Sequence, residues 1–296
     1  MLEQTERNPG IVERLLTFGR MIKFSHSIFA LPFAVVSAIV VVAMLEVTLT
    51  WVDVLLLLIC MVSARTAAMG FNRIADREID ALNPRTNRRE LPSGKISTGE
   101  AWIFTGGATV VFIAASFGVN QLCGLLSFPL LALLYGYSLT KRYTWASHFV
   151  LGACLGAAPI GVWFALTGSF HWAPILLGLG VTLWTAGFDI YYSLQDEEFD
   201  REKGLRSVPA RFGKQSSLWI VRFVHLLAVV AYAGFGIAAN LSFPFWFGLT
   251  AVTWILLYEA WLLRNGDLSK IDIAFFNLNG YVSILFAIAV VVDVML

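Results

Sequence analysis

Residues 72–95 read NRIADREIDALNPRTNRRELPSGK and form a charged stretch in a chain that is otherwise mainly apolar. Within this stretch Asn72, Asp76 and Asp80 recur every four residues, a spacing that places side chains on one face of a helix. Carboxylate and amide oxygens in such a row suit a hard divalent cation. The stretch then turns basic, with Arg85, Arg88, Arg89 and Lys95. Carboxylates beside cations predict a metal-bound phosphate site.

The composition is typical of an integral membrane protein. Of the 296 residues, 58% are hydrophobic and 14% are charged, whereas a soluble domain has about 45–50% and about 25%. The net charge of +1 gives no basic field that would favour nucleic acid as a partner. The cysteines lie far apart in apolar segments, which favours buried thiols over a disulfide or a metal site. They are Cys60, Cys123 and Cys154.

Nine apolar segments reach or approach the length of about 20 residues that a helix needs to cross the bilayer. They lie roughly at 24–45, 49–71, 101–118, 121–140, 146–167, 172–193, 216–239, 243–263 and 271–295. The sequence therefore predicts an all-α, polytopic protein of nine transmembrane helices. We expect a single transmembrane domain over residues 1–296.

Lysine and arginine gather on one side of this predicted bundle. The N-terminal stretch and the connections after the second, fourth, sixth and eighth segments hold them, while the other connections hold none. Cytoplasmic loops of membrane proteins carry an excess of these residues. We therefore expect a protein of the inner or plasma membrane. Its N-terminus and charged loops should face the cytoplasm, and its C-terminus should lie outside.

A second polar stretch follows the sixth segment. Residues 189–214 read DIYYSLQDEEFDREKGLRSVPARFGK, and Tyr192, Asp196 and Asp200 repeat the four-residue spacing about 120 positions later. Because four helices separate equivalent points, both stretches emerge at the same membrane face, as in a parallel repeat. Mg²⁺ binds through a few carboxylates together with substrate phosphates. The two stretches together predict a site for Mg²⁺ and a diphosphate.

Other polar residues have both a functional and a structural interpretation. Arg65 lies in an apolar helix about two turns before Asn72, and a cation at such depth needs a partner and indicates a functional site. Lys141 closes the fourth segment, where it is either a site residue or an interfacial anchor. The glutamates of the second stretch are as well explained by a solvated face. The histidines have no metal-ligand spacing, and we expect structural or interfacial roles for His26, His148, His171 and His225.

At these residues the chain resembles the UbiA superfamily of intramembrane aromatic prenyltransferases. The motif over 72–80, followed by RTNRRELPSG at 85–94, looks like the first Asp-rich signature of that family. The motif over 192–200, followed by GLRSVPARFG at 204–213, looks like the second. Residues 137–142, YSLTKR, are similar to the family's pattern after the fourth helix. The likeness spans nearly the whole chain.

The resemblance implies a UbiA-type bundle around a central cavity, and transfer from a polyprenyl diphosphate bound through Mg²⁺. The implied metal ligands are Asn72, Asp76, Asp80, Asp196 and Asp200. The implied catalytic residues are Asp76, Asp196, Tyr192 and Lys141. The expected substrate contacts are Arg65, Arg85, Arg89, Lys141, Tyr137, Lys23 and His26. For Lys23 and His26, anchoring at the membrane interface is an equal alternative.

Departures from the family pattern leave the acceptor open. Residues 89–92 read RELP where the family has RPLP, and Arg73 stands where many members have a second acid. The resemblance favours the bacterial 4-hydroxybenzoate polyprenyltransferase-like branch. We expect ring C-prenylation of an aromatic carboxylate such as 4-hydroxybenzoate, with release of diphosphate, in ubiquinone or menaquinone synthesis. The alternatives are a menaquinone precursor of the futalosine pathway or another acceptor, and, from a different class, a membrane transporter.

Overall fold

The computed structural model describes residues 11–22, 29–264, 268–271 and 273–296, and the regular elements within these ranges are helices. Among them, eight helical spans are long and apolar enough to cross a membrane. They are Trp51–Ala75 (α3), Thr98–Val119 (α5), Gln121–Thr140 (α6), Ser147–Thr167 (α7), Trp172–Glu202 (α8 with η2 and α9), Val208–Ala238 (α10), Phe243–Leu262 (α11) and Phe276–Met295. The last span combines the end of η4 (Ile273–Leu278) with α12 (Asn279–Met295). The predicted all-α membrane protein is confirmed.

The remaining predicted segment, residues 24–45, contains α2 (Leu31–Leu45), an apolar helix of 15 residues. At about 1.5 Å per residue such a helix is shorter than the hydrocarbon layer of roughly 30 Å. The described residues therefore hold eight full-length spans and one shorter apolar helix, so the predicted number of nine is approximate. Residues 24–28 of the predicted segment lie outside the described ranges.

Helix α10 begins at Val208 rather than at the predicted residue 216. The Ser207 hydroxyl accepts a hydrogen bond from the Ala210 N–H at 3.3 Å, and a proline stands in the first turn, which are two common features of a helix start. Gly213 then breaks the helix with φ 77° and ψ 167°, a conformation that glycine adopts at little steric cost. Hydropathy detects the apolar part after this break and misses the polar turn before it.

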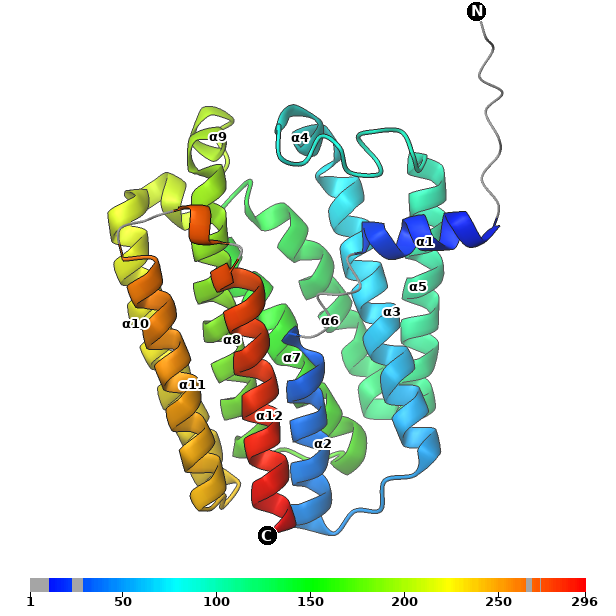
Figure 1. Cartoon of the computed structure of the whole chain (residues 1–296). Helices are drawn as coiled ribbons and strands as arrows, with labels where there is room; N and C mark the ends of the chain where they lie inside the picture. The colour runs from blue at the N-terminus through cyan, green and yellow to red at the C-terminus, as the bar shows by residue number, and fades with distance from the viewer. Residues whose placement is uncertain (1–10, 23–28, 265–267, 272) are drawn as a thin grey trace, which may run out of the picture.

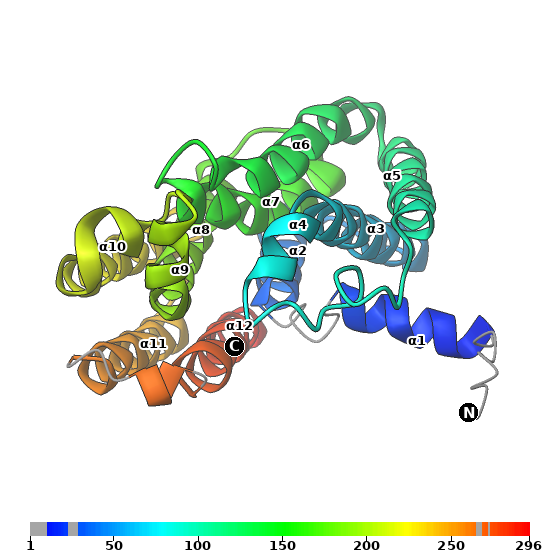
Figure 2. The ribbon, with the colours of Figure 1, turned by 90° about the horizontal axis from the view of Figure 1, so that it is seen from above.

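The helices form a bundle in which most helices pack against helices that are close to them in the sequence (Figures 1 and 2). Helix α2 packs against α7 and α12, and thereby joins the last helices to the middle of the chain. The largest core lies between α2, α8, α10, α11 and α12 and is rich in aromatic rings, such as Phe33, Trp184 and Phe286. A smaller core of Ala67, Phe112 and Leu131 joins α3, α5 and α6.

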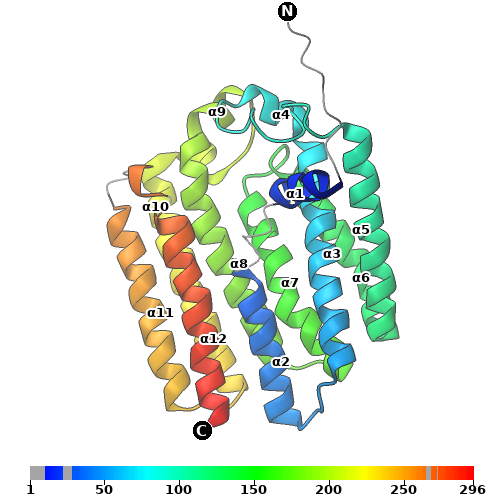
Figure 3. The same cartoon turned by 45° about the vertical axis from the view of Figure 1, so that its right-hand side comes forward.

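Helix α1 (Ile11–Met21) lies across the bundle, close to one end of α3 and α5 (Figures 1 and 3). Phe18 stacks on Phe104 of α5 with ring centroids 4.4 Å apart. The buried Arg73 of α3 donates from Nε to the Met21 carbonyl at 3.1 Å. These contacts attach α1 to the two helices beneath it.

Both Asp-rich stretches continue their helices past a local break. Helix α3 ends at Ala75, and α4 (Arg77–Leu82) follows directly after Asp76. Helix α8 (Trp172–Ser193) continues through a 3₁₀ turn, η2 (Leu194–Asp196), into α9 (Glu197–Glu202). Helices α4 and α9 lie at the same end of the bundle, and the C-terminus lies at the other (Figures 1 and 3). The predicted emergence of both stretches at one face is confirmed.

Candidate active site

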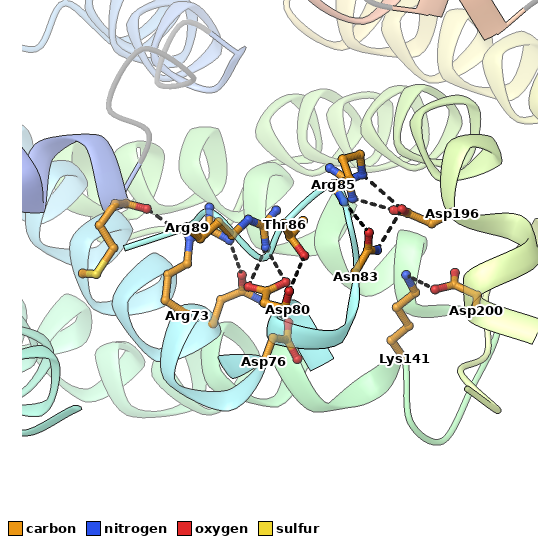
Figure 4. Close-up of polar contacts among 12 residues, drawn as sticks. Arg73, Asp76, Asp80, Asn83, Arg85, Thr86, Arg89, Lys141, Asp196 and Asp200 are labelled. Atoms are coloured by element: carbon orange, nitrogen blue, oxygen red, sulfur yellow. Dashed lines mark hydrogen bonds and ion pairs between the residues drawn. The ribbon is translucent and has the colours of Figure 1, made fainter. Parts of the chain in front are cut away.

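Four aspartates pair one to one with four cations at the end of the bundle where α4 and α9 lie. The ion pairs are Asp76–Arg142 at 3.5 Å, Asp80–Arg89 at 2.7 Å, Asp196–Arg85 at 2.5 Å and Asp200–Lys141 at 2.8 Å. The last three pairs are drawn in Figure 4. Since each carboxylate has a cationic partner, the two motifs form a polar cluster whose charges balance.

The link between the two Asp-rich stretches is the pair of Arg85 and Asp196 (Figure 4). Arg85 donates from Nε to Asp196 Oδ1 at 3.0 Å and from Nη2 to Oδ2 at 2.5 Å, the two-pronged geometry in which arginine binds a carboxylate most strongly. Burial opposes the charge of Arg85, but the hydrogen bond and the charge of Asp196 outweigh it and raise the pKa of the guanidinium. The contact therefore holds together segments that are 111 residues apart.

Asn83 positions both members of this pair. Its Nδ2 donates to Asp196 Oδ1 at 3.2 Å, and its Oδ1 accepts from the backbone N–H of Arg85 at 2.9 Å. The side chain is buried, so both amide groups find partners without water, as buried polar groups generally do. The predicted site did not include Asn83, although its position before Pro84 in a polar turn was visible in the sequence.

Tyr192 presents its ring to the same guanidinium. The Arg85 Cζ lies 5.3 Å from the ring centroid, and Nη1 donates to the Tyr192 hydroxyl at 3.2 Å. The face of an aromatic ring attracts a cation through its quadrupole. The structure thus places a positive charge over the ring of Tyr192.

Asp80 is held by its own stretch (Figure 4). Arg89 Nη1 lies 2.7 Å from each carboxylate oxygen, and the Thr86 hydroxyl donates to the Asp80 carbonyl at 3.1 Å. Both interactions fold the loop after α4 back onto that helix. Two predicted site residues, Asp80 and Arg89, are thereby brought together.

Asp76 is the most exposed of the four carboxylates, with 26% of its side chain accessible. Asn72 donates from Nδ2 to Asp76 Oδ2 at 2.9 Å, which is the contact expected of side chains four residues apart on a helix. Burial raises the pKa of Asp76, and the nearby charge of Asp80 raises it further, whereas Arg142 and Lys141 act in the opposite direction.

The Asp200 carboxylate is almost fully buried, with 1% of its side chain accessible. Its Oδ1 lies 2.8 Å from Lys141 Nζ. Apart from that ammonium group, its two oxygens accept no hydrogen bond from the described residues. A buried carboxylate with so few partners has room among its lone pairs for a further cationic ligand.

The oxygen atoms that a divalent ion needs as ligands are present, but each carboxylate is paired with a cationic side chain. Within the described part of the chain, no three acidic, histidine or cysteine side chains converge as a ready metal site. The carboxylates face arginine and lysine instead. Asp80, Asp196 and Asp200 nevertheless supply hard oxygen donors at one end of the bundle, and Asp200 lacks hydrogen bonds. This donor set fits Mg²⁺, provided that the cations exchange partners.

Some predicted site residues are not joined to this cluster by the described ion pairs. Arg65 is half-buried on α3, and the four aspartates pair with other cations. Tyr137 lies one turn before Lys141 on α6. Their participation stays a prediction. Lys23 and His26 lie outside the described residues.

Two contacts that the sequence did not reveal support the cluster. Arg142 pairs with Asp76 and also donates to the Ala75 carbonyl. His148 of α7 lies with Nδ1 2.6 Å from Asp189 Oδ2 on α8, while its Nε2 accepts from the Val208 N–H at 3.2 Å. Because Nε2 accepts, Nδ1 carries the proton. The structural role predicted for His148 agrees with its position between three helices.

Known proteins resemble this chain over most of its length. Residues 30–281 match the profile of the UbiA prenyltransferase family. A 4-hydroxybenzoate octaprenyltransferase of Pseudoalteromonas translucida (strain TAC 125) is 34% identical over 229 residues, 76% of each chain. A protein of the same name from Pseudomonas aeruginosa (strain UCBPP-PA14) is 32% identical over 219 residues, 73% of this chain and 72% of the other.

Solved structures share the fold. The apo structure of a UbiA homolog from Aeropyrum pernix K1 superimposes with a TM-score of 0.82 and 32% identity, covering 92% of this chain and 98% of that one. A UbiA homolog from Archaeoglobus fulgidus, bound to DMAPP and Mg²⁺, gives a TM-score of 0.62 at 16% identity, covering 92% of this chain and 99% of the other. With the family profile spanning residues 30–281, the chain belongs to the UbiA prenyltransferase family.

Proposed function

We propose that this protein transfers a polyprenyl group from polyprenyl diphosphate to the ring of 4-hydroxybenzoate or a similar aromatic carboxylate, for ubiquinone or menaquinone synthesis. The observation that carries the proposal is the contact between the two Asp-rich ends through Arg85 and Asp196, amid further carboxylate–cation pairs. The names of relatives that are 32–34% identical support the acceptor. The acidic side chains for a metal and the basic side chains for a diphosphate lie together at one end of the bundle.

Mg²⁺ would be held by the oxygen atoms of Asn72, Asp76, Asp80, Asp196 and Asp200. When bound, Mg²⁺ acts as a Lewis acid that neutralises charge developing on the departing diphosphate. The carboxylates give up their present partners when they take on this role. Arg85, Arg89 and Lys141 then become free to bind the oxygens of the diphosphate, which arginine recognises with two parallel hydrogen bonds.

The residues around the reacting carbon have separate tasks. The cations hold the diphosphate while the allylic C–O bond breaks and its electron pair leaves with the diphosphate. Tyr192 presents a ring face that stabilises the positive carbon, as it now stabilises Arg85 at 5.3 Å. Exclusion of water protects that carbon from hydrolysis. The acceptor ring attacks this carbon through its own carbon ortho to the hydroxyl, and that ring carbon then loses its proton.

The same arrangement supports an orientation in the membrane. The cations of the site and helices α4 and α9 lie at one end of the bundle, and the C-terminus lies at the other (Figure 1). By the positive-inside rule, the site and the N-terminus face the cytoplasm and the C-terminus lies outside. Reagents that label engineered cysteines from one side of sealed vesicles test this orientation.

The decisive experiment incubates the purified full-length protein with a labelled polyprenyl diphosphate, Mg²⁺ and a panel of aromatic acids, including 4-hydroxybenzoate and futalosine-pathway precursors. We expect one acid to be prenylated, and we expect Asp76→Ala and Asp196→Ala to lose the activity and the binding of Mg²⁺–diphosphate. Glu202→Ala is the matched control, because Glu202 is an exposed acid at the same end of the bundle. Absence of any prenylated product, with both variants binding Mg²⁺–diphosphate like the parent, would refute the proposal.

A further inference from the structure

A groove of about 770 Å³ lies between α1, α3 and α5, away from the carboxylate cluster. This volume is within the range of about 300–1,000 Å³ that is usual for small-molecule sites. Its lining is almost entirely apolar and comes from all three helices, for example Phe18 of α1, Val62 of α3 and Ile103 of α5. Ile103 and Val62 are exposed, so the groove opens to the outside of the bundle.

The groove has space at its walls and is closed toward the interior. A Cβ atom added at Gly19 of α1 or at Gly107 of α5 would meet no heavy atom within 4 Å. By contrast, a Cβ at Gly70 of α3 would lie 2.2 Å from the Thr105 hydroxyl of α5. Helices α3 and α5 therefore touch closely behind the groove, and an occupant enters from the bilayer rather than from the site between the Asp-rich ends.

Arginines of α1 and α4 contact the helices that line the groove. Arg20 follows Gly19 on α1, is exposed, and donates only to the Thr17 hydroxyl, at 2.9 Å, among the contacts described for it. Arg77 of α4 donates to the Thr98 hydroxyl at 2.6 Å, and Thr98 is the first residue of α5, about one and a half turns before Ile103.

Glu100, in the first turn of α5, is engaged in capping that helix. The Glu100 carboxylate accepts from the N–H of Ser97 at 2.9 Å and from its hydroxyl at 2.7 Å. Helix α1 lies across the bundle at the level where the membrane helices α3 and α5 approach their charged end (Figures 1 and 3). The apolar groove thus lies between helices that also carry Arg20 and the Arg77–Thr98 contact.

We propose that this groove binds one anionic phospholipid, with an acyl chain along α3 and α5 and the headgroup phosphate between Arg20 and Arg77. Basic side chains near the membrane surface attract anionic lipids, and the apolar lining accepts the chain. The bound lipid fills the space beneath α1 and attaches this helix to the bundle, in addition to the Phe18–Phe104 stack. The site is separate from the proposed prenyl transfer.

Native mass spectrometry of the purified full-length protein tests the proposal, with phosphatidylglycerol and phosphatidylcholine of identical acyl chains present in equal amounts. We expect retention of one phosphatidylglycerol in preference to phosphatidylcholine. Gly107→Leu should abolish this adduct by filling the groove. Gly106→Leu is the matched control, because the neighbouring Gly106 is equally open to an added Cβ but does not line the groove.

The headgroup contacts are tested with Arg20→Gln and Arg77→Gln. Each should weaken the binding of phosphatidylglycerol on the order of fivefold, whereas Arg264→Gln, at the end of α11, should leave it unchanged. If Gly107→Leu does not fold, Gly19→Leu blocks the groove from α1 instead.

Three results would overturn the proposal: equal retention of the two lipids, retention of phosphatidylglycerol by the blocked variants, or its displacement by a polyprenyl diphosphate. The last would assign the groove to the substrate.

Discussion

The two Asp-rich ends of the molecule share a spacing but differ in how far they depend on cations from other parts of the chain. In the first end, Asp80 pairs with Arg89, nine residues further along the same stretch, while Asp76 pairs with Arg142 of the turn after α6. Asp196 and Asp200 of the second end pair with Arg85 and Lys141, which belong to other parts of the chain. The second end is therefore neutralised only when the whole bundle is assembled.

Burial separates individual carboxylates rather than the two ends. The Asp76 side chain is 26% accessible and that of Asp200 is 1% accessible, whereas Asp80 and Asp196 are similar at 8% and 10%. A buried carboxylate depends strongly on its partner, because removal of one member of a buried pair leaves a charge without compensation. The two ends are therefore similar in spacing but not in the origin of their cations, and Arg85 is the side chain that joins them.

The largest expected effect is that of Arg85→Ala. This change removes a two-pronged contact to Asp196 and, in the proposed mechanism, a donor to the diphosphate, so the rate of prenyl transfer should fall about 10²–10³-fold. Arg88→Ala is the control, since Arg88 is an exposed arginine of the same turn. Similar rates for both variants, measured with saturating substrates, would show that the contact between the ends is unimportant for activity.

An intermediate effect on the transfer rate is expected from the different contact geometries of Arg85 and Arg89. Arg85 uses two nitrogen atoms on Asp196, whereas Arg89 approaches both oxygens of Asp80 with Nη1 alone. Lysine reproduces a single point charge but not a planar fork. We expect Arg85→Lys to lower the transfer rate about tenfold, and Arg89→Lys to lower it less. The reverse order would contradict the assigned difference between the ends.

The smallest expected effect concerns Asn83, which touches both members of the connecting pair. Asn83→Ala should reduce the free energy of unfolding by about 1 kcal/mol, because the Arg85 backbone N–H loses its hydrogen-bond partner while Asp196 Oδ1 still accepts from Arg85 Nε. The measurement is thermal unfolding of the protein in detergent. Asn87→Ala in the same loop is exposed and should have little effect; an equal loss of stability would indicate that the loop itself, rather than the pair, is sensitive.

Local patterns predicted most of the fold because membrane helices follow from hydropathy and charge. The spans from residue 49 to 193 agree with the structure within a few residues, and the shared face of the two motifs follows from counting helices. The start of α10 was missed because its first turn is polar and is separated from the apolar part by Gly213.

The sequence indicated most residues of the carboxylate–cation cluster but not their pairing. The four-residue spacing indicated the aspartates, and the basic turn after the first stretch indicated the arginines, since both are local features. The pairing of Asp196 with Arg85, and of Asp76 with Arg142, depends on how loops fold back across the bundle. The contribution of Asn83 likewise depends on tertiary geometry, because an asparagine before a proline is common in any turn.

The one-to-one pairing of carboxylates and cations has a thermodynamic consequence for a protein that binds two ligands. In the proposed function, an incoming Mg²⁺ would compete with an arginine or lysine for each carboxylate, and a diphosphate alone would compete with a carboxylate for each cation. With both ligands present, each displaced group would find a new partner, and the exchange would become favourable. The two ligands would then be linked, each raising the affinity for the other by the same factor, and the empty protein would hold neither tightly.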